Sequence, residues 1–266
     1  MKNTQIISVI NQKGGVGKTT TVINLATALS FYKKKVLVID LDPQGNATTG
    51  FGLSNNDDTK TVYDVLNGNS NFEDTIKDTK IDNLKLISSN VDLSGLEVET
   101  ASEKRRAFLL KDKIESFINS SQNDFSYIFI DCPPSLSLLT IMSLVVAKSL
   151  IVPLQAEFFA LEGLSQLMKT IDRVKDKLNP ALEIRGVLLT MFDKRNKLSA
   201  QVDTEARKFF NEKVYQTVIP RNVRLSEAPS HGVPILIYDE LCAGSKSYSS
   251  FAEEFLKQEN IMDSAA

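Results

Sequence analysis

Short apolar runs alternate with amphipathic segments along almost the whole chain. Between the runs, apolar residues spaced three and four apart predict helices at residues 21–29, 103–119, 161–178, 200–212 and 247–258. Runs rich in Val, Ile and Leu predict buried strands at residues 6–10, 35–40, 84–87, 127–131, 150–154, 185–190 and 216–220. Strands that alternate with helices favour right-handed crossovers. We therefore expect an α/β fold with a mostly parallel sheet flanked by helices on both faces.

A glycine-rich segment joins the first predicted strand directly to the first predicted helix. Residues 11–21 read Asn-Gln-Lys-Gly-Gly-Val-Gly-Lys-Thr-Thr-Thr. A strand, a glycine turn and a helix point several backbone N–H groups and a helix N-terminus at one anion. Lys18 can then reach the β- and γ-phosphates of a nucleotide, and the Thr19 hydroxyl can bind Mg²⁺. The sequence thus predicts a single P-loop NTPase domain.

The loop departs from the usual phosphate-loop pattern at its first positions. Gln12 stands where the pattern has glycine, and a second lysine, Lys13, follows it. Lys13 could be a solvated charge, or it could supply a second positive charge to phosphate. Because Lys18 already serves its own loop, Lys13 is most useful at the nucleotide of a neighbouring subunit. An arginine finger works in this way and accelerates turnover by about 10³–10⁵.

Three carboxylates follow predicted strands. Asp131 ends the run 127–131, and open α/β sheets bind ligands at the carboxyl ends of their strands. We expect Asp131 to hold Mg²⁺ through water, although strands also end in Asp as a helix cap. Asp40 and Asp42 alternate on one side of the extended chain. They are either solvated turn residues, or Asp42 contacts the attacking water while Asp40 supports the magnesium shell.

Composition is that of an ordinary soluble globular protein. Hydrophobic residues make up 42% and charged residues 24% of 266 residues, with a formal net charge of −2. Cys132 and Cys242 form no metal or disulfide spacing, so a reducing cytosol is the default expectation. The first residues do not resemble a signal peptide, and no apolar run has the length of a membrane span.

Five sequence blocks together resemble the ParA/Soj partition ATPases. This family belongs to the deviant Walker A group, which also holds the MinD cell-division ATPases. The blocks cover most of the chain and stand at residues 13–20, 40–46, 131–135, 155–163 and 219–230. The resemblance implies one ParA-type P-loop ATPase domain over residues 1–266.

The resemblance also implies an activity. A homodimer would enclose two ATP molecules with Mg²⁺, and Lys13 would cross to the partner's nucleotide. The dimer would bind double-stranded DNA without sequence specificity, and a ParB-type centromere-binding protein would stimulate otherwise slow hydrolysis. Such a protein would be cytoplasmic and associated with the nucleoid. The cargo could be a chromosome, a plasmid or another complex.

Matching the blocks position by position assigns roles to individual residues. Asp42 would be the hydrolytic residue, with Lys13 and Lys18 as the catalytic lysines. Thr19, Asp40 and Asp131 would serve the magnesium ion, and Pro220 and Asn222 would flank the adenine. The phosphate cradle would consist of Gly14, Gly15, Val16, Gly17, Lys18, Thr19 and Thr20.

Charge along the chain is uneven. Residues 169–224 hold 13 Lys and Arg against 7 Asp and Glu, whereas the remainder holds 18 against 26. Two basic clusters stand in loops at the ends of predicted strands, and the family's DNA contacts fall in these segments. The candidate DNA-binding residues are Arg195, Lys197, Arg221 and Arg224. Without interleaved aromatic residues, such contacts would go to phosphate and read little sequence.

Two other functions remain open. A MinD-like membrane-surface ATPase would need a basic amphipathic C-terminal helix, but residues 239–266 hold 2 Lys against 6 Asp and Glu. A nucleotide-gated DNA-binding regulator would bind the same ligands and hydrolyse little ATP.

Overall fold

The alternating strands form one seven-stranded sheet in the computed structural model, which describes residues 4–54, 59–120, 123–157 and 160–265. The strand order is β3-β4-β2-β5-β1-β6-β7, and only the β3–β4 pair is antiparallel. This topology confirms the predicted α/β fold with a mostly parallel sheet. The strands are β1 (Gln5–Val9), β2 (Val36–Asp40), β3 (Ile76–Asp78), β4 (Leu84–Ile87), β5 (Tyr127–Asp131), β6 (Ser149–Gln155) and β7 (Glu183–Thr190).

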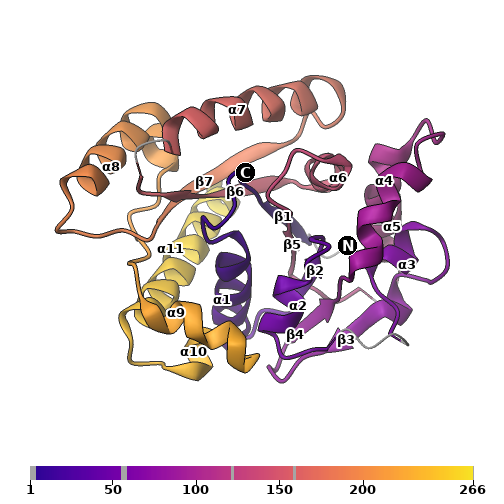
Figure 1. Cartoon of the computed structure of the whole chain (residues 1–266), viewed down its shortest axis with the longest axis horizontal. Coiled ribbons are helices and arrows are strands. Elements are labelled where there is room, and N and C mark those ends of the chain that lie inside the picture. The colour runs from indigo at the N-terminus through magenta and orange to yellow at the C-terminus, as the bar shows by residue number, and fades with distance from the viewer. Residues whose placement is uncertain (1–3, 55–58, 121–122, 158–159, 266) are drawn as a thin grey trace.

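Helices cover both faces of the sheet (Figure 1). The first and last helices, α1 and α11, pack with one face, and α5, α6 and α7 pack with the other. The α-helices are α1 (Lys18–Phe31), α2 (Asn46–Gly50), α3 (Val62–Leu66), α4 (Leu96–Glu99), α5 (Leu109–Asn119), α6 (Leu138–Val146), α7 (Ala160–Lys177), α8 (Lys197–Phe210), α9 (Val223–Glu227), α10 (Ile235–Tyr238) and α11 (Ala243–Ala265). The 3₁₀ helices are η1 (Glu73–Thr75), η2 (Val91–Gly95), η3 (Arg106–Phe108), η4 (Asn211–Lys213) and η5 (Ala228–His231).

Burial on both faces explains why the central strands have continuous apolar sequences. In β2, Leu37 and Ile39 belong to the core on one side of the sheet, whereas Val36 and Val38 belong to the core on the other. All four side chains are completely buried. A strand enclosed in this way has no solvated face and therefore shows no polar alternation.

The strand register brings the predicted functional segments together. β5 lies between β1 and β2, and Asp131 at its end is the register partner of both Val9 and Asp40. The glycine-rich loop follows β1 and leads into α1. The loop and the two carboxylates therefore meet at the carboxyl edge of the sheet, where ligands bind in open α/β folds.

The predicted strand at 216–220 is wrong. Within this segment only Pro220 forms a bridge, an isolated one with Phe192, and a second isolated bridge pairs the preceding Val214 with Val187 of β7. The Ile219 N–H still bonds the β7 backbone, but side chains take several of the other backbone groups that a continuous ladder would need. The Glu254 carboxylate accepts the N–H groups of residues 216 and 217 at 2.7 and 2.8 Å, and the Arg207 guanidinium donates to the carbonyls of residues 214 and 215.

The other predicted elements form, most of them with shifted ends. The helix predicted at 103–119 begins only at Leu109, because residues 103, 106 and 108 donate to carbonyls three positions earlier, as in 3₁₀ turns. The long polar connection at 43–60 contains α2, and its residues 55–58 lie outside the described part of the chain. Phe158 and Phe159 of the block at 155–163 also lie outside it. Within the described ranges, no helix has both the length and the apolarity of a membrane span.

Candidate functional site

The glycine-rich loop has the backbone conformation of a phosphate cradle. Gly15 and Gly17 adopt positive φ angles of 71° and 88°, a region that side-chain-bearing residues rarely enter. Gly17 is the N-terminal cap of α1, and its carbonyl accepts the N–H of Thr21 at 2.9 Å. The fourteen-residue helix thus starts at the loop, where its free N–H groups favour an anion.

Lys18 lies at the first position of this helix and is buried. Its Nζ donates to the carbonyl oxygen of Lys13 at 3.0 Å, so the side chain spans the loop. Burial lowers the pKa of Lys18, while Asp131, Cys132 and Asp42 oppose that shift. A partly desolvated ammonium that already faces the loop is arranged to receive phosphate oxygens.

Lys13 is held differently. Its backbone N–H donates to Asn11 Oδ1 at 3.0 Å, and the Asn11 amide is anchored to the Pro153 carbonyl in β6. Its half-exposed ammonium forms an ion pair with Glu157 at 3.1 Å. The Lys13 side chain is therefore engaged at the rim, beyond the end of β6, rather than across its own phosphate loop as Lys18 is.

Asp131 is a buried carboxylate without a hydrogen-bond partner among the described residues. Burial and the neighbouring Asp40 raise its pKa well above the ordinary value. The Thr19 hydroxyl partly opposes this shift, although its geometry falls short of a full hydrogen bond. Two orphaned carboxylate oxygens near a threonine hydroxyl are a donor set that suits a hard cation with its water shell.

Both carboxylate oxygens of Asp40 accept hydrogen bonds from the protein. Its Oδ1 accepts the Asp42 N–H at 3.2 Å, and its Oδ2 accepts both the N–H and the hydroxyl of Thr48 at 2.8 Å. Burial raises the pKa of Asp40 to about 6, against the effect of these hydrogen bonds. These hydrogen bonds favour an indirect contribution of Asp40 to a candidate magnesium site.

No group of three or more His, Cys, Asp or Glu side chains in the described ranges is arranged to hold a metal by itself. A cation at Thr19 and Asp131 would therefore need the phosphate oxygens of a nucleotide and water to complete its ligands. Magnesium ions are commonly bound in this way, through one or two carboxylates together with substrate phosphates.

Two adjoining cavities connect the loop with the segment after residue 218. The first, of about 470 Å³, is lined by loop residues and by Asp42, whose Oδ1 accepts the Gln44 N–H at 3.0 Å. The second, of about 370 Å³, is lined by Pro220 and Asn222. Both cavities are lined by Gly17, Thr20, Met191 and Pro229. The structure thus brings the predicted phosphate and adenine residues to one continuous site.

Sequence reasoning missed Met191 and Tyr248 in this site. Met191 lines both cavities and has a positive φ of 50°, which is rare for a bulky residue and concentrates at functional sites. Tyr248 lies in α11, and its buried hydroxyl is 3.2 Å from that of Thr21. No local sequence pattern signals a strained methionine or a tyrosine more than two hundred residues from the loop.

The predicted DNA-binding residues are all exposed. Arg195 and Arg221 line a further cavity of about 560 Å³, whereas Lys197 and Arg224 do not. Arg195 pairs with Asp193 at 3.0 Å. Arg224 pairs with Glu227 at 3.0 Å and Asp239 at 3.6 Å. The arginines are thus held locally by carboxylates.

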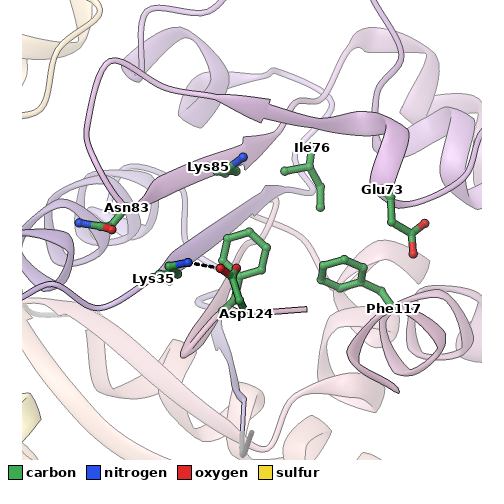
Figure 2. Close-up of a pocket in the computed structure, with 8 residues that line it drawn as sticks. Lys35, Glu73, Ile76, Asn83, Lys85, Phe117 and Asp124 are labelled. Atoms are coloured by element: carbon green, nitrogen blue, oxygen red, sulfur yellow. Dashed lines mark hydrogen bonds and ion pairs between the residues drawn. The ribbon is translucent and has the colours of Figure 1, made fainter. Parts of the chain in front are cut away.

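Another cavity, of about 500 Å³, lies away from these residues, before the amino ends of β2, β4 and β5 (Figure 2). Lys35 and Asp124 form an ion pair across it, and Phe117 is part of its wall. Its lysines are matched by Glu73 and Asp124, so its charge does not favour an anion. The glycine-rich loop therefore remains the candidate nucleotide site.

Comparison with known proteins agrees with this geometry. A family model described as an AAA domain matches residues 4–184. The chain is 50% identical to the chromosome partitioning protein ParA of Caulobacter vibrioides, over 96% of this chain and 95% of that protein. It is 49% identical to the sporulation initiation inhibitor protein Soj of Bacillus subtilis, over 94% and 97%.

A solved structure shares the fold. The cobyrinic acid a,c-diamide synthase of Mycobacterium smegmatis, with bound ATP analogue and magnesium, is 33% identical. The match covers 96% of this chain and 94% of that one, with a TM-score of 0.84. The curated relatives have higher identity and carry partitioning names. The chain therefore belongs to the ParA/Soj family of chromosome-partitioning ATPases.

Proposed function

We propose that this protein is a partitioning ATPase that binds Mg²⁺ and ATP in the two adjoining cavities and works as a homodimer. The observation that carries the proposal is the phosphate loop, with Lys18 across it and the orphaned Asp131 carboxylate at its base. The first cavity takes the phosphates, and Pro220 and Asn222 flank the adenine in the second. A single ATPase domain over residues 1–266 contains all of these parts.

Thr19 and Asp131 would hold the magnesium ion, and Asp40 would support the site indirectly, without binding the ion. Bound magnesium neutralises charge that develops on the phosphate oxygens. The partnerless Asp131 oxygens support this assignment, because they gain partners when the cation and its waters enter.

Asp42 is the hydrolytic residue in this proposal. It is buried at the wall of the phosphate cavity, and its carboxylate would orient the attacking water beside the γ-phosphate. Lys18 would bind the chain's own phosphates. Lys13, which is held at the rim by Glu157, would bind the phosphates of the partner subunit after dimerisation. Turnover is expected to be slow until the second subunit is present.

The proposal extends to two macromolecular partners. Arg195, Lys197, Arg221 and Arg224 would contact the phosphates of double-stranded DNA without reading its sequence. A ParB-type protein would stimulate hydrolysis and release the dimer from DNA. The protein would then be cytoplasmic and concentrated on the nucleoid.

The test compares wild-type protein with Asp42→Ala in Mg²⁺ and ATP. Because only the water-orienting carboxylate is lost, Asp42→Ala should bind ATP and dimerise, while turnover falls by about 10²-fold or more. Phosphate release and sedimentation measure the two properties. Equal turnover would remove Asp42 from its role. Absent turnover in the wild type, even with DNA and partner, would favour a nucleotide-gated regulator.

A further inference from the structure

A single carboxylate, that of Asp40, accepts hydrogen bonds from both ends of the loop that carries Asp42. Asp40 ends β2, and its Oδ1 accepts the N–H of Asp42. Its Oδ2 accepts the N–H and the hydroxyl of Thr48, each at 2.8 Å. Because Asp42 and Thr48 are the two ends of the segment 42–48, Asp40 holds both ends against the sheet.

Thr48 also connects this loop to a second strand. Its Oγ1 accepts the N–H of Ser89 at 3.1 Å, and Ser89 follows β4 by two residues. The Thr48 hydroxyl therefore uses its donor for Asp40 and an acceptor for Ser89. Thr48 is completely buried, so water cannot replace either bond if the hydroxyl is removed.

The bonds inside the loop are local and do not fix its position on the sheet. The Asp42 carboxylate accepts the Gln44 N–H, and the Asp42 carbonyl accepts the Gly45 N–H at 2.9 Å. These contacts shape a turn but link it to nothing outside itself. The bonds through Asp40 and Thr48 attach that turn to β2 and β4.

We propose that Asp40 and Thr48 form a clasp that positions Asp42 toward the phosphate cavity, and that Thr48 is a positioning residue for hydrolysis. The proposal rests on the proposed role of Asp42. Thr48 itself touches neither phosphate nor the attacking water in this scheme. Its effect is on the placement of Asp42, and small misplacements of a catalytic group can reduce rates by about 10²-fold.

The experiment compares Thr48→Val, which keeps the shape and loses the hydroxyl, with Thr48→Ser, which keeps the hydroxyl. Thr75→Val is the matched control, because Thr75 is equally buried and its hydroxyl bonds a backbone carbonyl at 2.6 Å in η1. Three quantities are measured: ATP turnover, affinity for a fluorescent ATP analogue with Mg²⁺, and hydrogen exchange of residues 42–48.

Thr48→Val should lower turnover by roughly 10–100-fold, change nucleotide affinity by less than about threefold, and speed exchange in residues 42–48. Thr48→Ser should restore both turnover and slow exchange, and Thr75→Val should leave both unchanged. Wild-type turnover with unchanged exchange in Thr48→Val would overturn the clasp. A loss in Thr48→Ser equal to that in Thr48→Val would also overturn it.

Hydrogen exchange separates this proposal from the proposed function. If the wild type lacks turnover, the hydrolytic assignment fails, but the exchange of residues 42–48 still reports on the clasp. If Thr48→Val does not fold, Asp40→Asn is the second variant, because it keeps the side-chain volume and places an amide group against backbone donors. Exchange in Asp40→Asn as slow as in the wild type would overturn the proposal.

Discussion

At the scale of single residues, the two loop lysines occupy different environments. Lys18 is buried and spans its own loop, whereas Lys13 is half-exposed and paired with Glu157. An exposed ion pair is worth at most about 1 kcal/mol, so Glu157 can release Lys13 at little cost. The pairing that holds Lys13 in the isolated chain therefore does not prevent it from binding another subunit's phosphates.

Lys13→Ala and Lys18→Ala should consequently fail in different ways. Lys13→Ala should bind ATP as a monomer through the intact loop but lose ATP-dependent dimerisation and turnover. Lys18→Ala should lose nucleotide affinity itself, by about tenfold or more, because a charge-assisted contact is removed. Sedimentation and nucleotide titration distinguish the two. Normal ATP-dependent dimerisation of Lys13→Ala would contradict the action across subunits.

The buried Asp131 carboxylate, the proposed cation ligand, affects how the stability of the nucleotide-free fold depends on pH. Its raised pKa means that the folded state holds the proton more tightly than the unfolded chain does. The stabilising contribution of the protonated form is therefore complete in acid and is lost as the pH rises through the raised pKa. Above the raised pKa, the nucleotide-free protein carries an unfavourable buried charge.

Asp131→Asn should therefore stabilise the nucleotide-free protein at neutral pH, by about 1–3 kcal/mol, and this gain should shrink toward about pH 4. The same variant should lose most of the additional stability that Mg²⁺ and ATP confer on the wild type. Urea unfolding at several pH values, with and without ligand, measures both effects. A gain that does not vary with pH would show that the carboxylate charge is not its cause.

At the scale of elements, α11 is attached to the sheet by a buried cation. Arg185 in β7 bonds Glu259 at 3.3 Å and the Phe255 carbonyl at 3.3 Å, and its guanidinium lies 3.9 Å from the Phe255 ring centroid. Tyr127 in β5 also donates to Glu259. These contacts join the last helix to two strands and thereby hold Tyr248 beside the second cavity.

Arg185→Met should destabilise the fold by about 1–3 kcal/mol, because it leaves the mostly buried Glu259 carboxylate with Tyr127 but without its cationic partner. The double variant Arg185→Met, Glu259→Gln should recover much of that loss, since the uncompensated charge is gone. Thermal unfolding of the two variants and of Glu259→Gln alone completes a double-mutant cycle. A double variant no more stable than Arg185→Met would contradict the electrostatic explanation.

The sequence predicts the bounds of a strand well where its residues are mostly apolar and buried. β4 and β5 have the predicted bounds, because Leu84 to Ile87 and Tyr127 to Asp131 form uninterrupted, mostly apolar runs. The phosphate loop was also predictable, since its glycines and lysine stand at fixed spacing. The conformation of 216–220 was not, because it depends on contacts with Arg207 and Glu254, which come from other elements. The positive φ of Met191 was not predictable either, because no local sequence pattern signals it.

At the scale of the whole molecule, the excess of positive charge lies in one part of the chain. Residues 169–224 run from α7 through β7 and α8 to the start of α9 (Figure 1). One copy of the DNA-binding surface proposed for this part of a net-acidic chain should bind DNA weakly. Two such surfaces on one dimer raise the avidity by about 10²-fold or more if both reach one duplex.

DNA binding should therefore depend on ATP, ignore sequence and weaken steeply with salt. Arg224→Ala should weaken binding to every duplex and reduce the log–log salt slope by about 0.9 for each phosphate that the dimer no longer neutralises. ATP-driven dimerisation should persist in this variant. Arg105→Ala is a matched control, because Arg105 is exposed and paired with Asp112 outside the basic segment.

Gel shifts across a salt series, with ATP and with ADP, measure these properties on unrelated duplexes. Equal binding in ADP, or a strong preference for one sequence, would contradict the dimer model. An equal effect of Arg105→Ala would show that the loss is a general consequence of reduced positive charge.

The segment after η4 affects how readily the protein aggregates at high concentration. Parallel sheets rich in Val and Ile can recruit further strands at an open edge, which leads to aggregation. Beyond β7, the N–H groups of Gln216 and Thr217 are already bonded to Glu254, and Pro220 has none. At the opposite edge, β3 is three residues long and carries Lys77 and Asp78. The interruption that prevents an eighth strand in one molecule thus also hinders sheet growth between molecules.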